Sequence, residues 1–291
     1  MKKNKIIVCI CARNFNVLLL SLLKSLAKNT NINFDVLIVF NKFKKITFFE
    51  MKLIQKILRN IHFSVNYEGK KGISNVRNKV LEILRKNNYD YIFFLDDDCV
   101  VNHNFLKNHL NFLNKEKCDI VGGPQLYLSN KKLFRVFERN LSNSNNISWV
   151  STNNVIFKRK ILLKNIEFSN RVSKYGFGED QLFFLKCSSL GFKIRWNDNP
   201  VYESVNKNMN LRWFLDRNYR YGLTGALIEK ELCGKYGFLI NLFKSFYYLV
   251  KSNFYIILMP LNPKLNFYFL LSNFLRSLGR IKGQLDLLND K

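Results

Sequence analysis

Three consecutive carboxylates, Asp96, Asp97 and Asp98, form the strongest chemical signal in the sequence. They follow residues 91–95, an apolar run typical of a buried strand. Adjacent carboxylates repel one another, and a divalent cation such as Mn²⁺ or Mg²⁺ relieves this by binding one or two of them together with phosphate oxygens. Because alternate side chains of an extended segment share a face, Asp96 and Asp98 are expected to hold the metal. The alternative is a solvated acidic turn.

A second acidic signal is the segment 174–180, KYGFGED, in which two glycines permit a tight turn. Glu179 and Asp180 then begin a predicted helix with apolar positions at Leu182, Phe183 and Leu185. Carboxylates at a helix N-terminus also stabilise the helix dipole, so this segment alone leaves a structural role open. Two acidic clusters within one domain favour a catalytic role.

The first two-thirds of the chain alternate between predicted strands and helices. Residues 6–10, 36–40 and 91–95 are short apolar runs, and residues 18–26 carry leucines at helical spacing. Ser74 is expected to cap a helix with the face Val76, Val80, Ile83 and Leu84. The alternation predicts an α/β fold with a mostly parallel sheet, in which ligands bind beyond the carboxyl ends of the strands.

The charge balance is strongly basic, with 47 Lys and Arg against 21 Asp and Glu among 291 residues, a net charge of +26. This charge favours anionic partners such as phosphorylated substrates, lipid headgroups or nucleic acid, although an A/T-rich genome would also raise the lysine content. The aromatic residues concentrate in apolar runs, so nucleic-acid binding is not expected and remains an alternative. The six cysteines lack metal-ligand spacing and are expected to be buried free thiols.

The C-terminal region, residues 206–291, changes in character. Residues 236–275 are dominated by Phe, Leu, Ile and Tyr, and Lys244, Lys251 and Lys264 interrupt them. No unbroken apolar run approaches the roughly 20 residues of a spanning helix. Amphipathic helices in a membrane interface are expected, with the lysines reaching toward the headgroups. The alternative is a helical appendage packed on the catalytic domain or on another subunit.

Seven segments occur in an order and at a spacing that resemble the family 2 glycosyltransferases, which have the GT-A fold. They are residues 8–14 (VCICARN), 72–78 (GISNVRN), 95–98 (LDDD), 122–124 (GGP), 153–159 (NNVIFKR), 178–180 (GED) and 212–222 (RWFLDRNYRYG). The resemblance implies a GT-A nucleotide-diphospho-sugar transferase domain over residues 1–205, with a Rossmann-like, mostly parallel sheet, followed by a helical, basic and apolar region over residues 206–291.

The resemblance also implies the reaction, an inverting hexosyl transfer in one displacement from a nucleotide-diphosphate sugar. Asp180 is expected to be the general base and Glu179 to orient the acceptor, while Asp98 and Asp96 hold Mn²⁺ or Mg²⁺ on the donor diphosphate. Further donor contacts are expected at Ala12, Arg13, Asn14, Asn41, Arg77, Asp96 and Asp97. Asn154, Arg217 and Arg220 are expected to meet the acceptor or a phosphate. For Arg77 a role as a helix-surface residue is the alternative.

The chain departs from the family pattern at two positions. Phe40 stands where relatives have the Asp that contacts the nucleotide base, and Glu203 stands where many have a His after the last strand. The donor nucleotide and sugar therefore stay open, and a catalytically inactive, membrane-bound subunit is the main alternative. By family resemblance the acceptor is a saccharide or a lipid-linked saccharide of bacterial surface polysaccharide, lipopolysaccharide or glycolipid synthesis, and the enzyme is expected in the cytoplasm, on the inner face of the plasma membrane.

Overall fold

The computed structural model describes residues 4–41, 45–129, 131–138, 141, 147–205 and 209–289. The chain divides into two compact units. The sheet unit comprises Met1–Leu128, Arg139–Ser169 and Phe183–Ser204. The helical unit comprises Ser129–Glu138, Asn170–Leu182 and Val205–Lys291.

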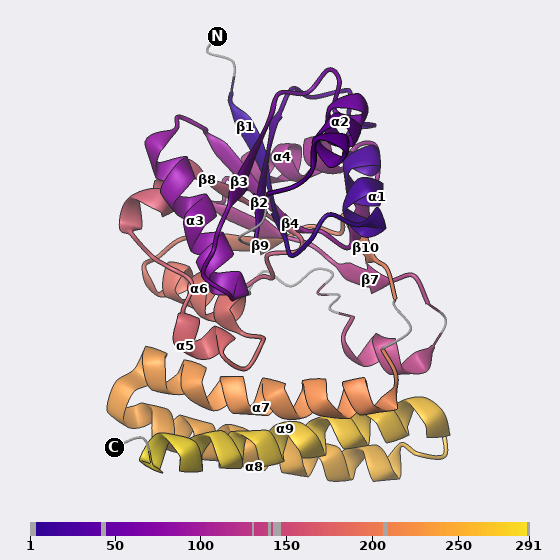
Figure 1. Ribbon diagram of the computed structural model, residues 1–291. Helices are drawn as coiled ribbons and strands as arrows, with labels where there is room; N and C mark the ends of the chain where they lie inside the picture. Colours follow the sequence, from indigo (N-terminus) through magenta and orange to yellow (C-terminus); the bar gives the residue numbers. More distant parts are fainter. Residues whose placement is uncertain are drawn as a thin grey trace. The chain divides into compact units, whose positions relative to one another are not determined.

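The sheet unit is built on a seven-stranded sheet in the order β3-β2-β1-β4-β8-β6-β9 (Figure 1). Its strands are β1 (Ile6–Ala12), β2 (Asp35–Phe40), β3 (Phe63–Tyr67), β4 (Tyr91–Asp96), β6 (Ile120–Gly122), β8 (Val155–Lys158) and β9 (Ile194–Trp196). The strands β1 to β4 are mutually parallel, β8 pairs antiparallel with both β4 and β6, and β9 is parallel to β6. The α/β class with a mostly parallel sheet is thus confirmed.

A second, three-stranded sheet lies in the same unit, in the order β5-β10-β7. Here β10 (Val201–Glu203) pairs antiparallel with β5 (Cys99–Val101) and parallel with β7 (Gln125–Tyr127). Because β5 follows β4 after only two residues, this small sheet begins at the acidic triplet.

Helices cover both faces of the large sheet, as expected for buried parallel strands. Alternate residues of β1 enter two separate cores: Val8 and Ile10 pack in one, and Ile7 and Cys9 in the other. The covering helices are α1 (Val17–Leu26), α2 (Phe48–Ile57), α3 (Ile73–Lys86), α4 (Phe105–Lys115) and the end of α6 (Glu179–Ser189). In Figure 1, α1 and α2 lie on one side of the strands and α3 on the other.

The expected strands and helices are confirmed, but the expected helix cap is wrong. The N-cap of α3 is Gly72, with φ +124°, and it makes no side-chain capping bond. Ser74 instead lies buried in the first turn, where its hydroxyl donates to the carbonyl of Ser169 at 3.0 Å. Among the cysteines, five are buried as expected and Cys233 is only half-buried.

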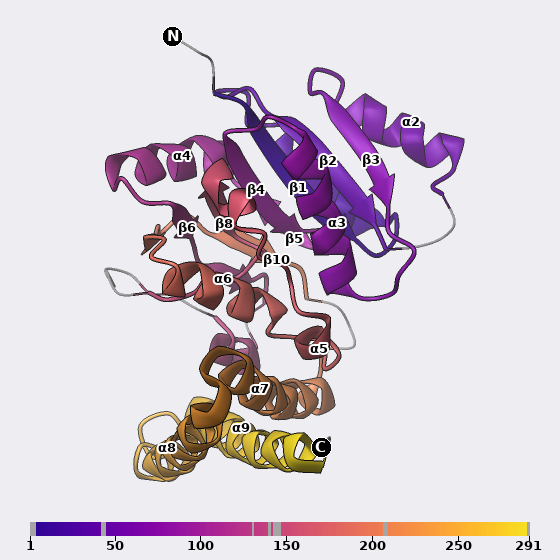
Figure 2. The same ribbon diagram turned by 90° about the vertical axis from the view of Figure 1, so that its left-hand side faces the viewer.

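The helical unit contains three long helices, α7 (Leu211–Cys233), α8 (Gly237–Ile257) and α9 (Pro263–Asn289), which run side by side in Figures 1 and 2. Its short elements are η1 (Lys132–Val136), α5 (Asn170–Ser173) and η3 (Gly234–Tyr236), and α6 begins in it. A helical C-terminal region is thus confirmed. Within the described residues, none of the helices combines the length and the apolar character needed to cross a membrane.

Candidate active site

The carboxyl ends of β1, β2 and β4 carry the polar residues singled out by the sequence. From β1 the chain adds β2 and then β3 on one side of the sheet, and it then crosses over to place β4 on the other side of β1. The position between β1 and β4 is therefore the topological switch point, where α/β sheets bind ligands. Arg13 follows β1, Asn41 follows β2, and Asp96 ends β4. The fold therefore places these three residues at one edge of the sheet.

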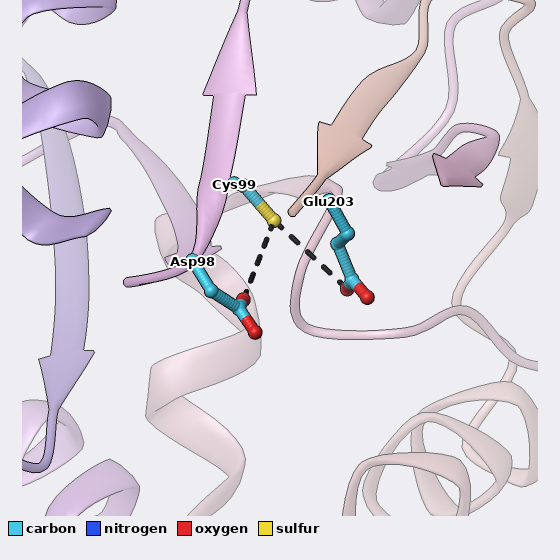
Figure 3. Close-up of side chains that lie close together, drawn as sticks. All are labelled: Asp98, Cys99 and Glu203. Carbon is cyan, nitrogen blue, oxygen red and sulfur yellow. Dashed lines mark hydrogen bonds between the residues drawn. The ribbon is translucent and has the colours of Figure 1, made fainter. Parts of the chain in front are cut away.

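An acidic cluster lies just after the end of β4, where Asp98, Cys99 and Glu203 come together (Figure 3). The antiparallel register of β5 and β10 sets Cys99 opposite Glu203. The Cys99 Sγ lies 4.0 Å from Asp98 Oδ1 and 4.0 Å from Glu203 Oε1. One oxygen from each carboxylate and the sulfur all lie within 4.8 Å of one another, a spacing that fits a single metal ion.

Burial and crowding of like charges dominate the electrostatics here. Burial, and then the charges of Glu203, Asp96 and Asp97, raise the pKa of Asp98 to about 8. Burial and the charge of Asp96 raise the pKa of Asp97 to about 6, and the backbone N–H of Arg13 opposes this shift by donating to Asp97. Burial also raises the pKa of the Cys99 thiol well above its usual value, so the sulfur stays protonated. With these pKa values, Asp98 is mostly protonated at neutral pH, whereas Asp97 stays mostly ionised.

Asp96 has a different partner. Its Oδ1 accepts a hydrogen bond from Arg77 Nη2 at 3.2 Å. Arg77 is only 5% exposed and its guanidinium lies 5.7 Å from the ring centroid of Phe168, so the alternative of a helix-surface residue is wrong. A buried guanidinium beside a carboxylate at the sheet edge is suited to binding phosphate.

Asn41 braces the loop that leads into α3. Its amide donates to the carbonyls of Glu68, at 3.2 Å, and Lys70, at 2.7 Å, while its Oδ1 accepts from Gly72 N at 3.0 Å. Its backbone N–H also donates to the Ala12 carbonyl at 2.9 Å. Asn41 therefore ties the ends of β1 and β2 to the turn before Arg77.

Two neighbouring asparagines have distinct roles. The Asn154 amide donates to the backbone carbonyls of Pro124 and Asn199, at 2.9 and 3.0 Å. Asn153 instead donates to Glu203 Oε1 at 2.8 Å. The side chain that touches the acidic cluster is therefore Asn153, which the sequence did not single out.

In the helical unit, Glu179 and Asp180 form the first turn of α6. Gly178, with φ +89°, packs so closely on α7 that an added Cβ would lie 3.2 Å from Thr224 Cβ. The Asp180 Oδ1 accepts from the backbone N–H of Gln181 at 2.7 Å, and Glu179 is buried. A packed glycine therefore fixes the position of both carboxylates relative to α7.

The two arginines of α7 differ in environment. Arg217 lies among aromatic rings, with its guanidinium carbon 5.0 Å from the centroids of Phe137, Phe177 and Trp213. Arg220 forms a more exposed pair with Asp216, one helical turn earlier, at 2.9 Å. Arg217 is therefore built into a packed aromatic cluster that includes the residue before Gly178.

The sequence missed Cys99 and Asn153, and assigned Glu203 no role of its own. Pairing between β5 and β10, about 100 residues apart in the chain, brings these residues to Asp98. The available signals were local: Cys99 directly follows the acidic triplet, and Glu203 ends a predicted strand.

A switch-point sheet edge with a carboxylate cluster is the architecture of a GT-A glycosyltransferase. The sequence profile of glycosyl transferase family 2 matches residues 7–178, more than half of the chain. The chain belongs to this family. No curated protein sequence gives a significant match.

Solved structures share the fold. The S. aureus TarS 1–349 structure in complex with UDP aligns with a TM-score of 0.55 and 18% identity, over 96% of this chain and 91% of that one. The mannosyltransferase PcManGT from Pyrobaculum calidifontis, in complex with GDP-Man and Mn²⁺, aligns with a TM-score of 0.66 and 14% identity, over 97% and 87%. Both likenesses extend over nearly the whole chain.

Proposed function

We propose that the protein is an inverting glycosyltransferase that transfers a hexosyl group from a nucleotide-diphosphate sugar to a saccharide or lipid-linked acceptor. The cluster of Asp98 and Glu203 is the observation that supports this proposal most strongly, because two close carboxylates suit a metal-bound diphosphate. Arg77, which pairs with Asp96, adds a buried cation at the end of the same strand. The GDP-Man and Mn²⁺ in the PcManGT structure support the same assignment.

The cluster fits a divalent cation. Asp98 and Glu203 would hold Mn²⁺ or Mg²⁺, hard ions that prefer oxygen ligands, whereas the protonated Cys99 thiol is a poor ligand for them. The cation would offset negative charge on the departing nucleoside diphosphate. Asp96 remains our candidate for a further carboxylate contact, with Arg77 holding it in place.

The remaining donor contacts are assigned to the sheet edge. We assign Arg77 to a donor phosphate, and residues Ala12, Arg13, Asn14 and Asp97 to the nucleotide. Asn41 acts by holding the 68–72 loop rather than by touching the donor with its side chain, because its side-chain amide is already bonded to that loop. Asn154 likewise acts by fixing the backbone around it, because its amide donates to two backbone carbonyls.

Asp180 is assigned as the general base that takes the proton from the acceptor hydroxyl, with Glu179 as its neighbour that orients the acceptor. Arg217 and Arg220 are assigned to the acceptor side. The acceptor belongs to bacterial surface polysaccharide, lipopolysaccharide or glycolipid synthesis, and the catalytic region over residues 1–205 works on the cytoplasmic face of the plasma membrane.

The test is release of nucleoside diphosphate from a panel of nucleotide sugars, with Mn²⁺, Mg²⁺ or chelator. Wild type should hydrolyse one donor slowly in the presence of metal. Asp98→Asn, Glu203→Gln and Asp180→Asn should each lose at least about 100-fold, a typical loss for one catalytic or metal-binding group. Glu82→Gln, a change of a half-exposed side chain on α3, is the matched control and should keep full activity.

Nucleotide could also bind in a metal-dependent way without turnover, with this binding lost in Asp98→Asn. That result would support the proposed metal site and indicate that the acceptor is required for turnover. If no donor gave turnover and no donor bound, the proposal would be refuted in favour of an inactive, membrane-bound relative.

A further inference from the structure

The three-helix bundle of α7, α8 and α9 has an unusual distribution of polarity. The buried residues of α8 are Gly237, Asn241, Ser245 and Ser252, all small or polar. Its exposed residues are mostly large and apolar: Phe238, Leu239, Leu242, Phe243, Phe246, Tyr247, Leu249, Val250, Phe254, Ile256 and Ile257. A helix on a water-soluble bundle shows the opposite arrangement.

Hydrogen bonds between the helices occupy the interior of the bundle. Between α7 and α9, Ser272 Oγ donates to Asn218 Oδ1 at 2.6 Å. Between α8 and α9, Arg280 Nη1 donates to Asn241 Oδ1 at 2.8 Å, and Ser277 Oγ donates to the Ser245 carbonyl at 2.8 Å. Polar side chains thus join the three helices from within.

Glycines bring the helix backbones together. A Cβ added to Gly279 of α9 would lie 2.1 Å from the Tyr219 carbonyl of α7, and one added to Gly222 would lie 2.3 Å from the Arg276 carbonyl. On α8, a Cβ at Gly237 would lie 2.5 Å from the Glu229 carbonyl. Small residues at the helix contacts and polar side chains between helices hold the bundle together, and the large apolar side chains of α8 are left on its outer surface.

The charges of this segment identify the occupant of the apolar face. Between Glu231 and Asp286 the sequence has no acidic residue. Of the basic residues in that interval, Arg276 and Arg280 bond within the bundle, and Lys244 and Lys282 pair with Glu229 and Asp286. The other cations of the interval are Lys235, Lys251 and Lys264. A second copy of this segment would bring like charges together, whereas anionic lipid headgroups complement them.

Lysines along α8 also indicate how the helix meets the lipid. Lys251 extends over the ring of Tyr247, with Nζ 5.6 Å from the centroid, and Lys244 pairs with Glu229 of α7. A helix with a lysine at mid-length beside an aromatic ring is suited to the plane of the interface, where Lys251 can reach the headgroups.

We propose that the exposed apolar face of α8, centred on Phe243, Phe246 and Ile257, is embedded in the interfacial layer of an anionic phospholipid membrane. This inference rests on the proposed membrane location of the enzyme and assigns that location to one surface. It does not depend on the donor, the metal or the reaction.

The experiment measures binding of the purified full-length protein to vesicles of phosphatidylcholine, with and without phosphatidylglycerol, by co-sedimentation. Binding should be stronger to the anionic vesicles and should weaken as salt rises. Phe243→Glu should weaken it at least about tenfold, because it replaces an aromatic ring that would enter the membrane with a charge. The matched control is Phe49→Glu on α2, since Phe49 is 78% and Phe243 73% exposed. This control should bind as wild type does.

A second measurement reports contact with the acyl chains. The fluorescence that Phe243→Trp adds to that of the three native tryptophans should be quenched by brominated phospholipids, whereas the fluorescence that Phe49→Trp adds should not. Circular dichroism and metal-dependent donor hydrolysis check that each variant is folded, since neither position belongs to the proposed catalytic machinery.

Equal binding of wild type and Phe243→Glu, or equal loss in Phe49→Glu, would overturn the proposal. So would a lipid-free dimer that Phe243→Glu dissociates, because the face would then be covered by a second copy. If no nucleotide sugar is hydrolysed but vesicle binding behaves as expected, the proposed function fails and this inference stands.

Discussion

Substituting Glu203 with glutamine should stabilise the metal-free protein at alkaline pH while abolishing its response to metal. Glu203 is buried and is the largest charged contributor to the raised pKa of Asp98. Glutamine retains an oxygen that can accept the 2.8 Å hydrogen bond from Asn153. The substitution therefore removes one negative charge with little loss of packing.

The magnitude follows from the Asp98 pKa. A rise in the pKa from 3.8 to about 8 opposes ionisation of Asp98 by about 6 kcal/mol if all of it acts in the folded state. Asp98 is only partly buried, so solvent screens part of this cost, and Glu203 contributes only one share of it. We expect Glu203→Gln to raise the free energy of unfolding by about 1–2 kcal/mol at pH 8.5, a Tm increase of about 2–6 °C.

The sign depends on pH. Because the pKa of Asp98 is higher in the folded than in the unfolded state, the folded state binds more protons between about pH 4 and pH 8. The free energy of unfolding therefore falls as pH rises through this window. At pH 5 folded Asp98 is protonated in both proteins, so the benefit of Glu203→Gln should nearly disappear.

The assay is thermal unfolding with chelator at pH 5 and pH 8.5, followed by titration with Mn²⁺. Wild type should gain stability with metal and the variant should not. Glu82→Gln is the control and should lower the Tm instead of raising it, because hydrogen bonds from Lys79 and Lys86 lower the pKa of Glu82 to about 2 and so stabilise its charged form. A Tm increase equal at both pH values, or a less stable Glu203→Gln at pH 8.5, would refute the argument.

Three further predictions concern single side chains. Cys99→Ser should keep metal-dependent donor hydrolysis within about threefold of wild type, because a protonated thiol is not a ligand for Mn²⁺; a larger loss would make Cys99 a ligand. Arg217→Ala should lower the free energy of unfolding, measured by denaturant titration, by about 1–3 kcal/mol, because the guanidinium contacts several rings. Arg220 is more exposed, so Arg220→Ala should lower the free energy of unfolding by less than about 1 kcal/mol. Gly178→Ala should lower kcat for donor hydrolysis and lower the free energy of unfolding by about 1–3 kcal/mol. Gly191 has a similar positive φ but no atom within 4 Å of an added Cβ, so Gly191→Ala should lower the free energy of unfolding less and leave kcat unchanged.

The strands were predictable because a parallel strand buried on both faces is a continuous apolar run. Residues 6–10, 36–40 and 91–95 all lie within observed strands. The cap of α3 was not predictable in the same way. Ser74 has the residue type of a cap, but burial against the segment ending at Ser169 gave its hydroxyl a tertiary partner.

The acidic triplet was recognisable as a site because three adjacent carboxylates gain nothing from packing. The partners of each carboxylate were not recognisable. Alternation predicted that Asp96 and Asp98 share one ligand, and this stays a prediction. The structure adds that Asp96 pairs with Arg77 and that Asp98 lies beside Glu203. The pairing of β5 with β10 decides this arrangement, and a short strand pairing across 100 residues leaves no periodic signal in the sequence.

The phenylalanine at position 40 bears on whether the protein is an active enzyme. Phe40 is fully buried at the end of β2, and its ring stacks on Tyr67 with centroids 6.0 Å apart. This side chain therefore belongs to the core, and a polar contact to a nucleotide base cannot come from position 40. Asp98 and Glu203 hold their geometry through the β5–β10 pairing, which does not involve β2. We infer that the change at Phe40 alters recognition of the nucleotide and leaves intact the carboxylates that we propose as metal ligands. This favours the proposed active transferase, with a different donor preference, over an inactive subunit.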